Sequence, residues 1–217
     1  NLGAIGATSA VQAAAITKVG SPQTGTITND DAATVALAAN VSQVEASTPQ
    51  TFSVTLSNPV DVAVTVLFNT SDGTATTADN DYNGITNQTV TFPAGTTTAQ
   101  SVPVTINNDA KVEADEVYNA AIGTLNASGR NVSLGTSTRT GTILNDDNAN
   151  LTLSGGIAHN AGNAGTTSYT STATLSAAVQ GGFTAPYTTN DGTATTADAD
   201  YTDNDGTLTF AGTAGET

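Results

Sequence analysis

A dense cluster of acidic side chains lies in residues 108–116, which read NDAKVEADE. Four carboxylates fall within eight positions there, and Lys111 is the only cation among them. Alternating apolar runs at residues 100–106 and 117–125 predict a strand on each side, so the acids belong to a loop between two strands. Carboxylate and carbonyl oxygens are the ligands that Ca²⁺ prefers, and its roughly 6–8 ligand positions tolerate a flexible loop. The loop therefore predicts a calcium site, with a solvated acidic hairpin loop as the alternative.

Charge and composition narrow the possible classes of function. The 217 residues carry 4 Lys and Arg against 19 Asp and Glu, for a net charge of −15. The chain therefore lacks the basic surface that binding to nucleic acid or to an anionic membrane requires. No apolar run approaches the ~20 residues that a membrane-spanning helix needs. The absence of Cys excludes disulfides and thiolate metal sites, and it is compatible with an extracellular protein if metal ions cross-link the fold.

Two motifs occur twice in the chain. TGTITNDD at residues 24–31 returns as TGTILNDD at residues 140–147, 116 positions later. DGTATTADNDY at residues 72–82 returns as DGTATTADADY at residues 191–201, 119 positions later. Internal repetition of this kind indicates a tandem array of similar domains. It predicts one complete module at residues 32–147.

The remaining residues are interpreted as parts of two neighbouring modules. Residues 1–31 would be the C-terminal part of a preceding module, and residues 148–217 the truncated N-terminal part of a following one. Neither fragment contains an equivalent of residues 99–117, so the two do not add up to one module. Together with the absence of Met, this predicts a segment of a longer array. The junctions between repeats are short, so successive modules should follow each other closely.

Apolar and polar side chains alternate along several short segments of the middle module. The alternating apolar positions are Phe52, Val54 and Leu56; Val64, Val66 and Phe68; Val90 and Phe92; Val102, Val104 and Ile106; and Tyr118, Ala120 and Ile122. A period of two predicts half-buried strands, and several such strands separated by turn residues are typical of a two-sheet sandwich. The predicted fold class is all-β, with tandem Ig-like antiparallel β-sandwich modules.

The motifs of the middle module follow one another in a characteristic order. Glu45 comes first, then DGTATTADNDY, a strand containing TFPAG, the acidic loop and TGTILNDD. In this order they resemble the Calx-beta domain, a family that includes the calcium-sensing modules of sodium/calcium exchangers and many repeats of large bacterial surface proteins and adhesins. The resemblance covers residues 32–147 and both flanking fragments. It implies Ca²⁺ as the cofactor, bound at one end of the sandwich.

The resemblance also implies the ligands of the ion. In the middle module the matching positions are Glu45, Asp81, Asp109, Glu113, Glu116, Asp146 and Asp147. In the flanking fragments they are Asp30, Asp31 and Asp200. Every second turn of a sandwich lies at the same end, so these distant segments can converge. Carboxylates gathered there would repel one another without a counter-ion.

Some positions depart from the family's pattern. Asn108 and Asn145 stand where the family often has a further Asp, and Asn160 stands at the position of Glu45 in the third copy. An amide oxygen can coordinate an ion but carries no charge. The departures therefore predict fewer ions or weaker binding.

Residues 79–84 imitate the start of an EF-hand calcium loop. The twelfth position of such a loop is Val90 here rather than the required bidentate Glu, and a strand follows instead of a helix. The EF-hand interpretation is therefore rejected. Asp72 and Asp191 each precede a Gly and are interpreted as turn formers rather than ligands.

We expect the chain to be a calcium-binding structural repeat of a large extracellular surface protein of adhesin type, with calcium stiffening the junctions between modules. Its partners would be the neighbouring modules of the same chain and, in a fibre or surface layer, other copies. The alternative is a calcium-dependent module that binds carbohydrate or protein. An enzyme is not expected, because no nucleophile motif is present and the Glu113/Glu116 pair lacks the aromatic cleft of a glycosidase.

Overall fold

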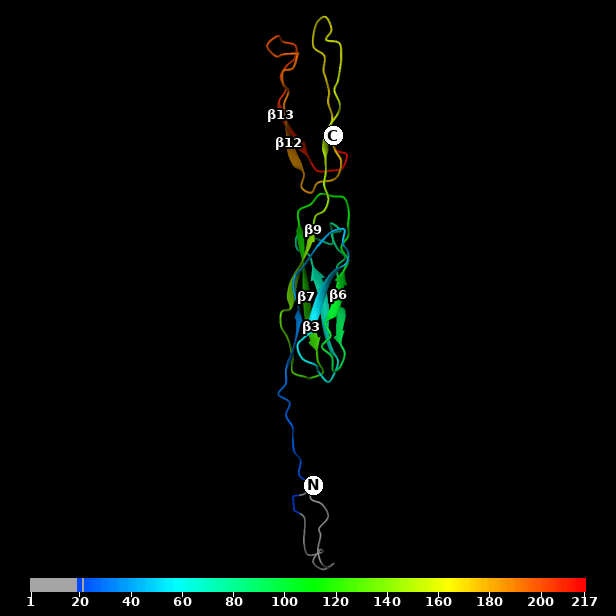
Figure 1. Ribbon diagram of the computed structural model, residues 1–217, viewed down its shortest axis with the longest axis vertical. Coiled ribbons are helices and arrows are strands. Elements are labelled where there is room, and N and C mark those ends of the chain that lie inside the picture. The colour runs from blue at the N-terminus through cyan, green and yellow to red at the C-terminus, as the bar shows by residue number, and fades with distance from the viewer. Residues whose placement is uncertain (1–18, 21) are drawn as a thin grey trace, which may run out of the picture. The chain divides into compact units, whose positions relative to one another are not determined.

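A computed structural model describes residues 19, 20 and 22–217 (Figure 1). Contacts divide the chain into two compact units, Asn1–Asp31 and Ala32–Thr217. Most of the predicted preceding-module fragment, residues 1–18 and 21, lies outside the described residues. Its remaining part, residues 19, 20 and 22–31, is exposed and contains no strand. All strands described below belong to the second unit.

The middle module consists of two β-sheets. The four-stranded sheet has the order β6-β3-β1-β8, and the five-stranded sheet has the order β2-β9-β7-β4-β5. The strands are β1 (Ala33–Leu37), β2 (Val41–Val44), β3 (Gln50–Leu56), β4 (Val64–Ser71), β5 (Gln88–Phe92), β6 (Gln100–Val104), β7 (Glu116–Asn126), β8 (Val132–Leu134) and β9 (Thr138–Leu144). Neighbours pair antiparallel except β1 with β8 and β2 with β9, which pair parallel. The predicted all-β sandwich is confirmed.

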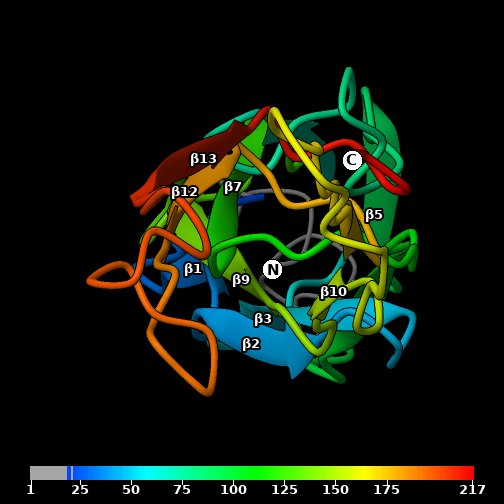
Figure 2. The ribbon, with the colours of Figure 1, turned by 90° about the horizontal axis from the view of Figure 1, so that it is seen from above.

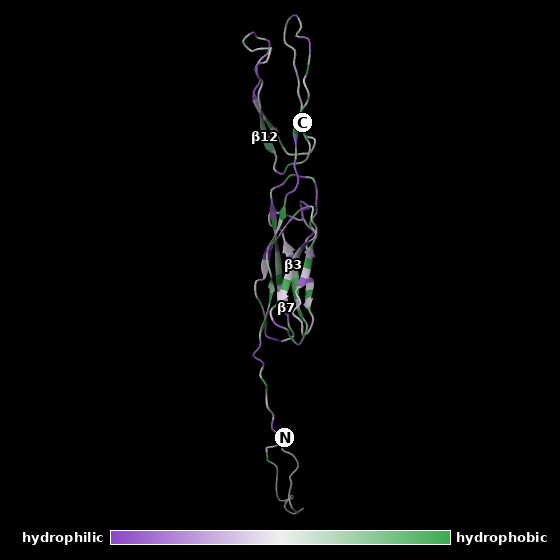
Figure 3. Ribbon diagram, viewed as in Figure 1, coloured by the Kyte–Doolittle hydropathy of each residue, from purple (hydrophilic) through white to green (hydrophobic). Residues whose placement is uncertain are grey.

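The core lies between the two sheets, at the positions that the alternation predicts. Every one of the predicted inward positions is buried, from Phe52 in β3 to Ile122 in β7. The alternation is visible along β3 in Figure 3, where green hydrophobic bands follow pale bands of intermediate hydropathy. Ile106 lies beyond the end of β6, and there it forms an isolated bridge with Tyr82. Burial of one face of each strand is the main term that holds the module together.

The C-terminal region forms two strand pairs of its own. β10 (Leu151–Leu153) pairs antiparallel with β11 (Ala173–Leu175), and β12 (Phe183–Tyr187) pairs antiparallel with β13 (Gly206–Phe210). By position in the repeat, they correspond to the β1–β3 and β4–β5 pairs of the middle module. Within the described residues no helix is long and apolar enough to cross a membrane.

Candidate metal centre

Four chain segments reach one end of the sandwich because of the way their strands pair. β2 and β9 run parallel and side by side, so Glu45 and residues 145–147 leave the sheet together (Figure 2). The Glu45 amide still donates to the Leu144 carbonyl at 3.1 Å. β7 runs antiparallel to β9, and β4 antiparallel to β7, which brings the loops at residues 72–87 and 105–115 to the same end. We call this end the acidic pole.

A first acidic group consists of Glu45, Asp146 and Asp147. Each offers a carboxylate oxygen, and these oxygens all lie within 4.8 Å of one another. Two oxygens bound to one Ca²⁺ at about 2.4 Å are at most about 4.8 Å apart, so this spacing suits a shared ion. Glu45 is only 5% exposed, and Asp147 Oδ2 is shielded from solvent without a hydrogen-bond partner. A buried carboxylate oxygen without a donor is unfavourable unless a cation completes it.

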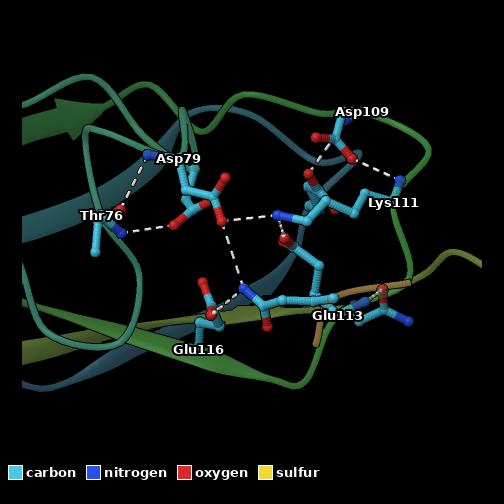
Figure 4. Close-up of polar contacts among 10 residues, drawn as sticks. Thr76, Asp79, Asp109, Lys111, Glu113 and Glu116 are labelled. Carbon is cyan, nitrogen blue, oxygen red and sulfur yellow. Dashed lines mark hydrogen bonds and ion pairs between the residues drawn. The ribbon is translucent and has the colours of Figure 1, made fainter. Parts of the chain in front are cut away.

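A second acidic group consists of Asp79, Asp81 and Glu113, whose carboxylate oxygens also lie within 4.8 Å of one another. Asp79 and Asp81 come from the loop after β4, and Glu113 comes from the acidic loop (Figure 4). The Thr76 amide donates to Asp81 Oδ2 at 2.5 Å, which fixes this carboxylate in its loop. The two groups together concentrate six carboxylates from three loops and the end of β9.

Lys111 is the cation that contacts the second acidic group. Its ammonium lies 2.7 Å from Asp79 Oδ2 and 2.5 Å from Glu113 Oε1 (Figure 4). Burial disfavours the charged ammonium, but the hydrogen bonds to Asp79 and Glu113 outweigh it and raise the pKa of Lys111 above its usual value. The side chain therefore stays charged at neutral pH.

Backbone groups hold the acidic loop in place. The Asp109 amide donates to Glu45 Oε1 at 3.2 Å, and the Lys111 amide donates to Asp109 Oδ1 at 2.7 Å. The Glu113 amide donates to the Asn145 side-chain oxygen at 3.0 Å. Asn145, noted in the sequence only as a missing charge, thus links the acidic loop to the end of β9.

Burial and like charge raise the pKa values of two carboxyl groups at the pole. Burial raises the pKa of Glu45 to about 7, and the charges of Asp109, Asp147 and Glu113 add to the effect against the opposing Asp109 amide. Burial likewise raises the pKa of Glu116 to about 7, with further contributions from Asp81 and Glu113 and an opposing hydrogen bond from Gln180. These raised pKa values mean that ionisation of the two carboxyl groups is unfavourable unless a cation binds nearby.

The structure brings together five of the ten predicted ligands in the two groups: Glu45, Asp81, Glu113, Asp146 and Asp147. Asp109 and Glu116 lie beside them, through the contacts of Asp109 with Glu45 and the effect of Asp81 on Glu116. Asp30, Asp31 and Asp200 are exposed and belong to no such group in the described part of the chain. Asp79 was missed by sequence reasoning because it was considered only as part of an EF-hand, although it lies two positions from Asp81.

The following module contacts the acidic pole directly. The Val112 amide donates to the Ala178 carbonyl and the Gln180 amide donates to the Val112 carbonyl, both at 2.9 Å, in a parallel bridge between Val112 and Val179. The Gln180 side chain donates to Asp79 Oδ2 at 3.4 Å and to Glu116 Oε1 at 3.3 Å. The loop that carries Glu113 is therefore also the surface on which the next module rests.

A cluster of aromatic side chains packs in the core next to the acidic pole. The rings of Tyr82 and Tyr118 stack at 4.4 Å between centroids, and Phe52 meets Tyr118 edge-on at 6.1 Å. The Tyr118 hydroxyl donates to Gln50 Oε1 at 2.6 Å. Gly141 lies against the Tyr118 ring, and a Cβ atom there would collide with it. Because Tyr82 follows Asp81 in the chain, this stack sets the position of a predicted ligand.

The fold and the acidic pole define a β-sandwich with a candidate site for hard divalent cations. The sequence model of the Calx-beta domain matches residues 28–148 and 164–217, and the chain belongs to the Calx-beta family. Calx-beta domains are calcium-binding domains.

Solved structures with a similar fold include two domains of Calx proteins. The first is the apo form of the Calx CBD1 domain, with 23% identity, a TM-score of 0.48 and coverage of 54% of this chain and 100% of that chain. The second is the calcium-binding domain CBD12 of CALX1.1, with 22% identity, a TM-score of 0.47 and coverage of 81% of this chain and 69% of that chain. A comparison with curated protein sequences found no match.

The residues at the pole fit a calcium ion. All six side chains of the two groups are carboxylates, and Asn145 and nearby backbone carbonyls supply neutral oxygens, which is the donor set of a hard cation. Asp147 Oδ2 is shielded from solvent and has no hydrogen-bond partner, so a cation would complete it. Glu45, Asp146 and Asp147 would hold the ion, which would supply the charge that these carboxylates lack.

Proposed function

We propose that this chain is a calcium-binding segment of a tandem Calx-beta array, in which calcium at the acidic pole of one module fixes its junction with the next. The role is structural rather than catalytic. The setting is a large extracellular surface protein of adhesin type, and the partners are the neighbouring modules of the same chain and, in a fibre or surface layer, other copies.

The contact between Val112 and residues 178–180 is the observation that supports this proposal most strongly. It joins the acidic loop to the following module by two backbone hydrogen bonds of 2.9 Å. A cation that orders the acidic loop therefore also orders the surface that receives the next module. Loss of the cation would leave the carboxylates of the pole repelling one another beside the junction.

Composition is compatible with the extracellular setting. The chain has no Cys and a net charge of −15, so it relies neither on disulfides nor on basic surfaces. An array without disulfides gains stability from ions that bind only the folded state. The connection from β9 to β10, residues 145–150, is short, so the next strand must begin close to the acidic pole.

Calorimetric titration with Ca²⁺ and with Mg²⁺ tests the proposal. We expect Ca²⁺ to bind with a Kd on the order of 10⁻⁵ to 10⁻³ M, as in extracellular calcium modules, and to raise the melting temperature. Mg²⁺ should bind more weakly, because it demands a near-ideal octahedral set and gives up its waters reluctantly, whereas Ca²⁺ accepts irregular sets of oxygens. No heat and no shift in melting temperature at millimolar Ca²⁺ would show the proposal to be wrong.

A further inference from the structure

The two acidic groups differ in one respect that bears on how calcium enters. The second group has a cation in contact with it, since the Lys111 ammonium lies between Asp79 and Glu113 (Figure 4). The described residues place no Lys or Arg nitrogen within ion-pair distance of the first group. Asp147 Oδ2 of the first group and Glu113 Oε1 of the second are both shielded from solvent, but only Glu113 Oε1 has the Lys111 ammonium beside it, at 2.5 Å. One group is thus already neutralised in part, and the other is not.

The Lys111 ion pair is more shielded from solvent than an ordinary surface ion pair. The side chain of Lys111 is 23% exposed and that of Glu113 is 10% exposed, whereas Arg130 and Asp61 form an ion pair with exposures of 43% and 68%. The Lys111 backbone is held by its hydrogen bond to Asp109 Oδ1. A shielded pair of this kind is costly to break one partner at a time, because the remaining charges stay buried.

We infer that Lys111 is a tethered cation of the second acidic group, so that calcium binds the first group directly but enters the second only by displacing the Lys111 ammonium. This inference rests on the proposed binding of calcium at the acidic pole. Calcium carries twice the charge of the ammonium and can accept several oxygens at once, so it can replace the ammonium at sufficient concentration.

Displacement of Lys111 would also affect the junction with the next module. Asp79 Oδ2 accepts both the Lys111 ammonium and the Gln180 amide of the following module. An ion that takes this oxygen competes with both donors. Calcium would fill the first group at lower concentration. At higher concentration it would enter the second group and there change the contact between the modules.

The variant Lys111→Gln, compared with Arg130→Gln, tests the inference on the full chain. Both variants remove one positive charge, but Arg130 pairs with Asp61 and contacts neither acidic group. In EDTA, Lys111→Gln should lower the melting temperature by several degrees, because it leaves the second group without its cation, and Arg130→Gln should change it little. In calcium titrations, Lys111→Gln should raise the affinity of the second binding step by about tenfold or more relative to Arg130→Gln.

Amine labelling gives a second readout on the unaltered protein. An amine-reactive ester should acylate Lys111 slowly in EDTA and faster in saturating calcium, with Lys18, the other lysine of the chain, as the internal reference. Mass spectrometry of the peptides measures both rates. The expected result is a calcium-dependent increase at Lys111 alone.

The outcomes separate this inference from the proposed function. If the wild-type chain binds calcium but Lys111→Gln matches Arg130→Gln in EDTA and in calcium, the proposed function stands and the inference is overturned. An unchanged rate of Lys111 acylation in saturating calcium would overturn it as well. If no variant binds calcium, the proposed function is wrong, and displacement of Lys111 by calcium is wrong with it.

Discussion

The repeated motif at residues 72–82 and 191–201 folds into the same local loop in both places but forms a candidate metal site in only one. Asp72 and Asp191 each accept a hydrogen bond of 2.8 Å from the Tyr ten positions later. The amides of Thr76 and Thr195 donate to Asp81 and Asp200 in the same way, at 2.5 Å and 3.0 Å. Asp72 and Asp191 also accept from the amides of Thr77 and Thr196, so each holds its loop together in the same way.

The two copies differ in what surrounds this loop. Asp81 and Tyr82 are 7% and 2% exposed, and Tyr82 stacks on Tyr118. Asp200 is exposed, and Tyr201 is only partly buried. Local sequence therefore forms the loop, and the acidic loop with β7 converts it into part of a metal centre.

Among the variants proposed for comparing the two copies, Tyr118→Ala should have the largest effect on the free energy of unfolding. It removes the ring that packs on Tyr82 and Phe52 and leaves Gln50 without its hydroxyl partner, so we expect a loss of about 3–5 kcal/mol in the free energy of unfolding. Chemical denaturation measures it. Tyr201→Ala is the control and should cost far less, since Tyr201 lacks such a stack; equal losses would contradict the packing described here.

Asp147→Asn should remove most of the stabilisation that calcium provides. At a calcium concentration about 100-fold above Kd, the wild-type gain should be about 2.7 kcal/mol. Asp147 contributes the buried unpaired oxygen of the first acidic group, whereas Asp200 belongs to no group among the described residues. Asp200→Asn is thus the matched control and should keep the full gain. If both variants lose the same amount, net charge rather than a site governs the response.

The calcium-free protein should become less stable between pH 5 and pH 8. The pKa values of Glu45 and Glu116 are raised from 4.5 to about 7, so the folded state binds more protons than the unfolded state in this range. The free energy of unfolding then falls as pH rises through this window. Hydrogen bonds from Arg130 to Asp61 and from Tyr82 to Asp72 lower the pKa values of these two carboxyl groups, which therefore do not oppose the trend.

Melting curves in EDTA at the two pH values measure this effect. The melting temperature should be lower by several degrees at pH 8, and Glu45→Gln should flatten the dependence because the substituted side chain does not ionise. A melting temperature that rises with pH in EDTA would contradict the assignment of Glu45 as a buried, uncompensated carboxylate.

Tyr82→Phe and Tyr201→Phe should show the smallest effects and compare the two copies most closely. Each removes one hydroxyl that donates to an Asp at 2.8 Å. Tyr82 is buried, so the loss should be about 1 kcal/mol, whereas Tyr201 can replace the bond with water and should lose much less. Chemical denaturation of both variants measures the two losses in the free energy of unfolding. A larger loss for Tyr201→Phe than for Tyr82→Phe would contradict the explanation from burial.

The sequence predicted the sandwich and part of its metal centre. Strict alternation around Phe52 and Tyr118 identified the inward faces, since a period of two has few alternative explanations. The convergence of Glu45 with Asp146 and Asp147 followed from the family resemblance and is explained by the parallel pairing of β2 with β9.

The remaining features depend on long-range neighbours that no local pattern encodes. Asp79 joins the site only because the loop after β4 meets Lys111, 32 positions later, and Gln180 reaches it from 101 positions away. In the same way, TGTILNDD forms part of β9 beside β2 and β7, whereas TGTITNDD at residues 24–31 forms no strand. Nearly identical motifs thus acquire different roles through their partners.

Small-angle scattering on a protein with two complete modules, with calcium and with a chelator, tests the central claim most directly. If calcium at the acidic pole fixes the junction, chelation should shorten the maximum dimension or broaden its distribution, while the β-sheet circular dichroism persists. The claim would be contradicted if calorimetry shows calcium binding but the scattering profile is the same with and without the ion.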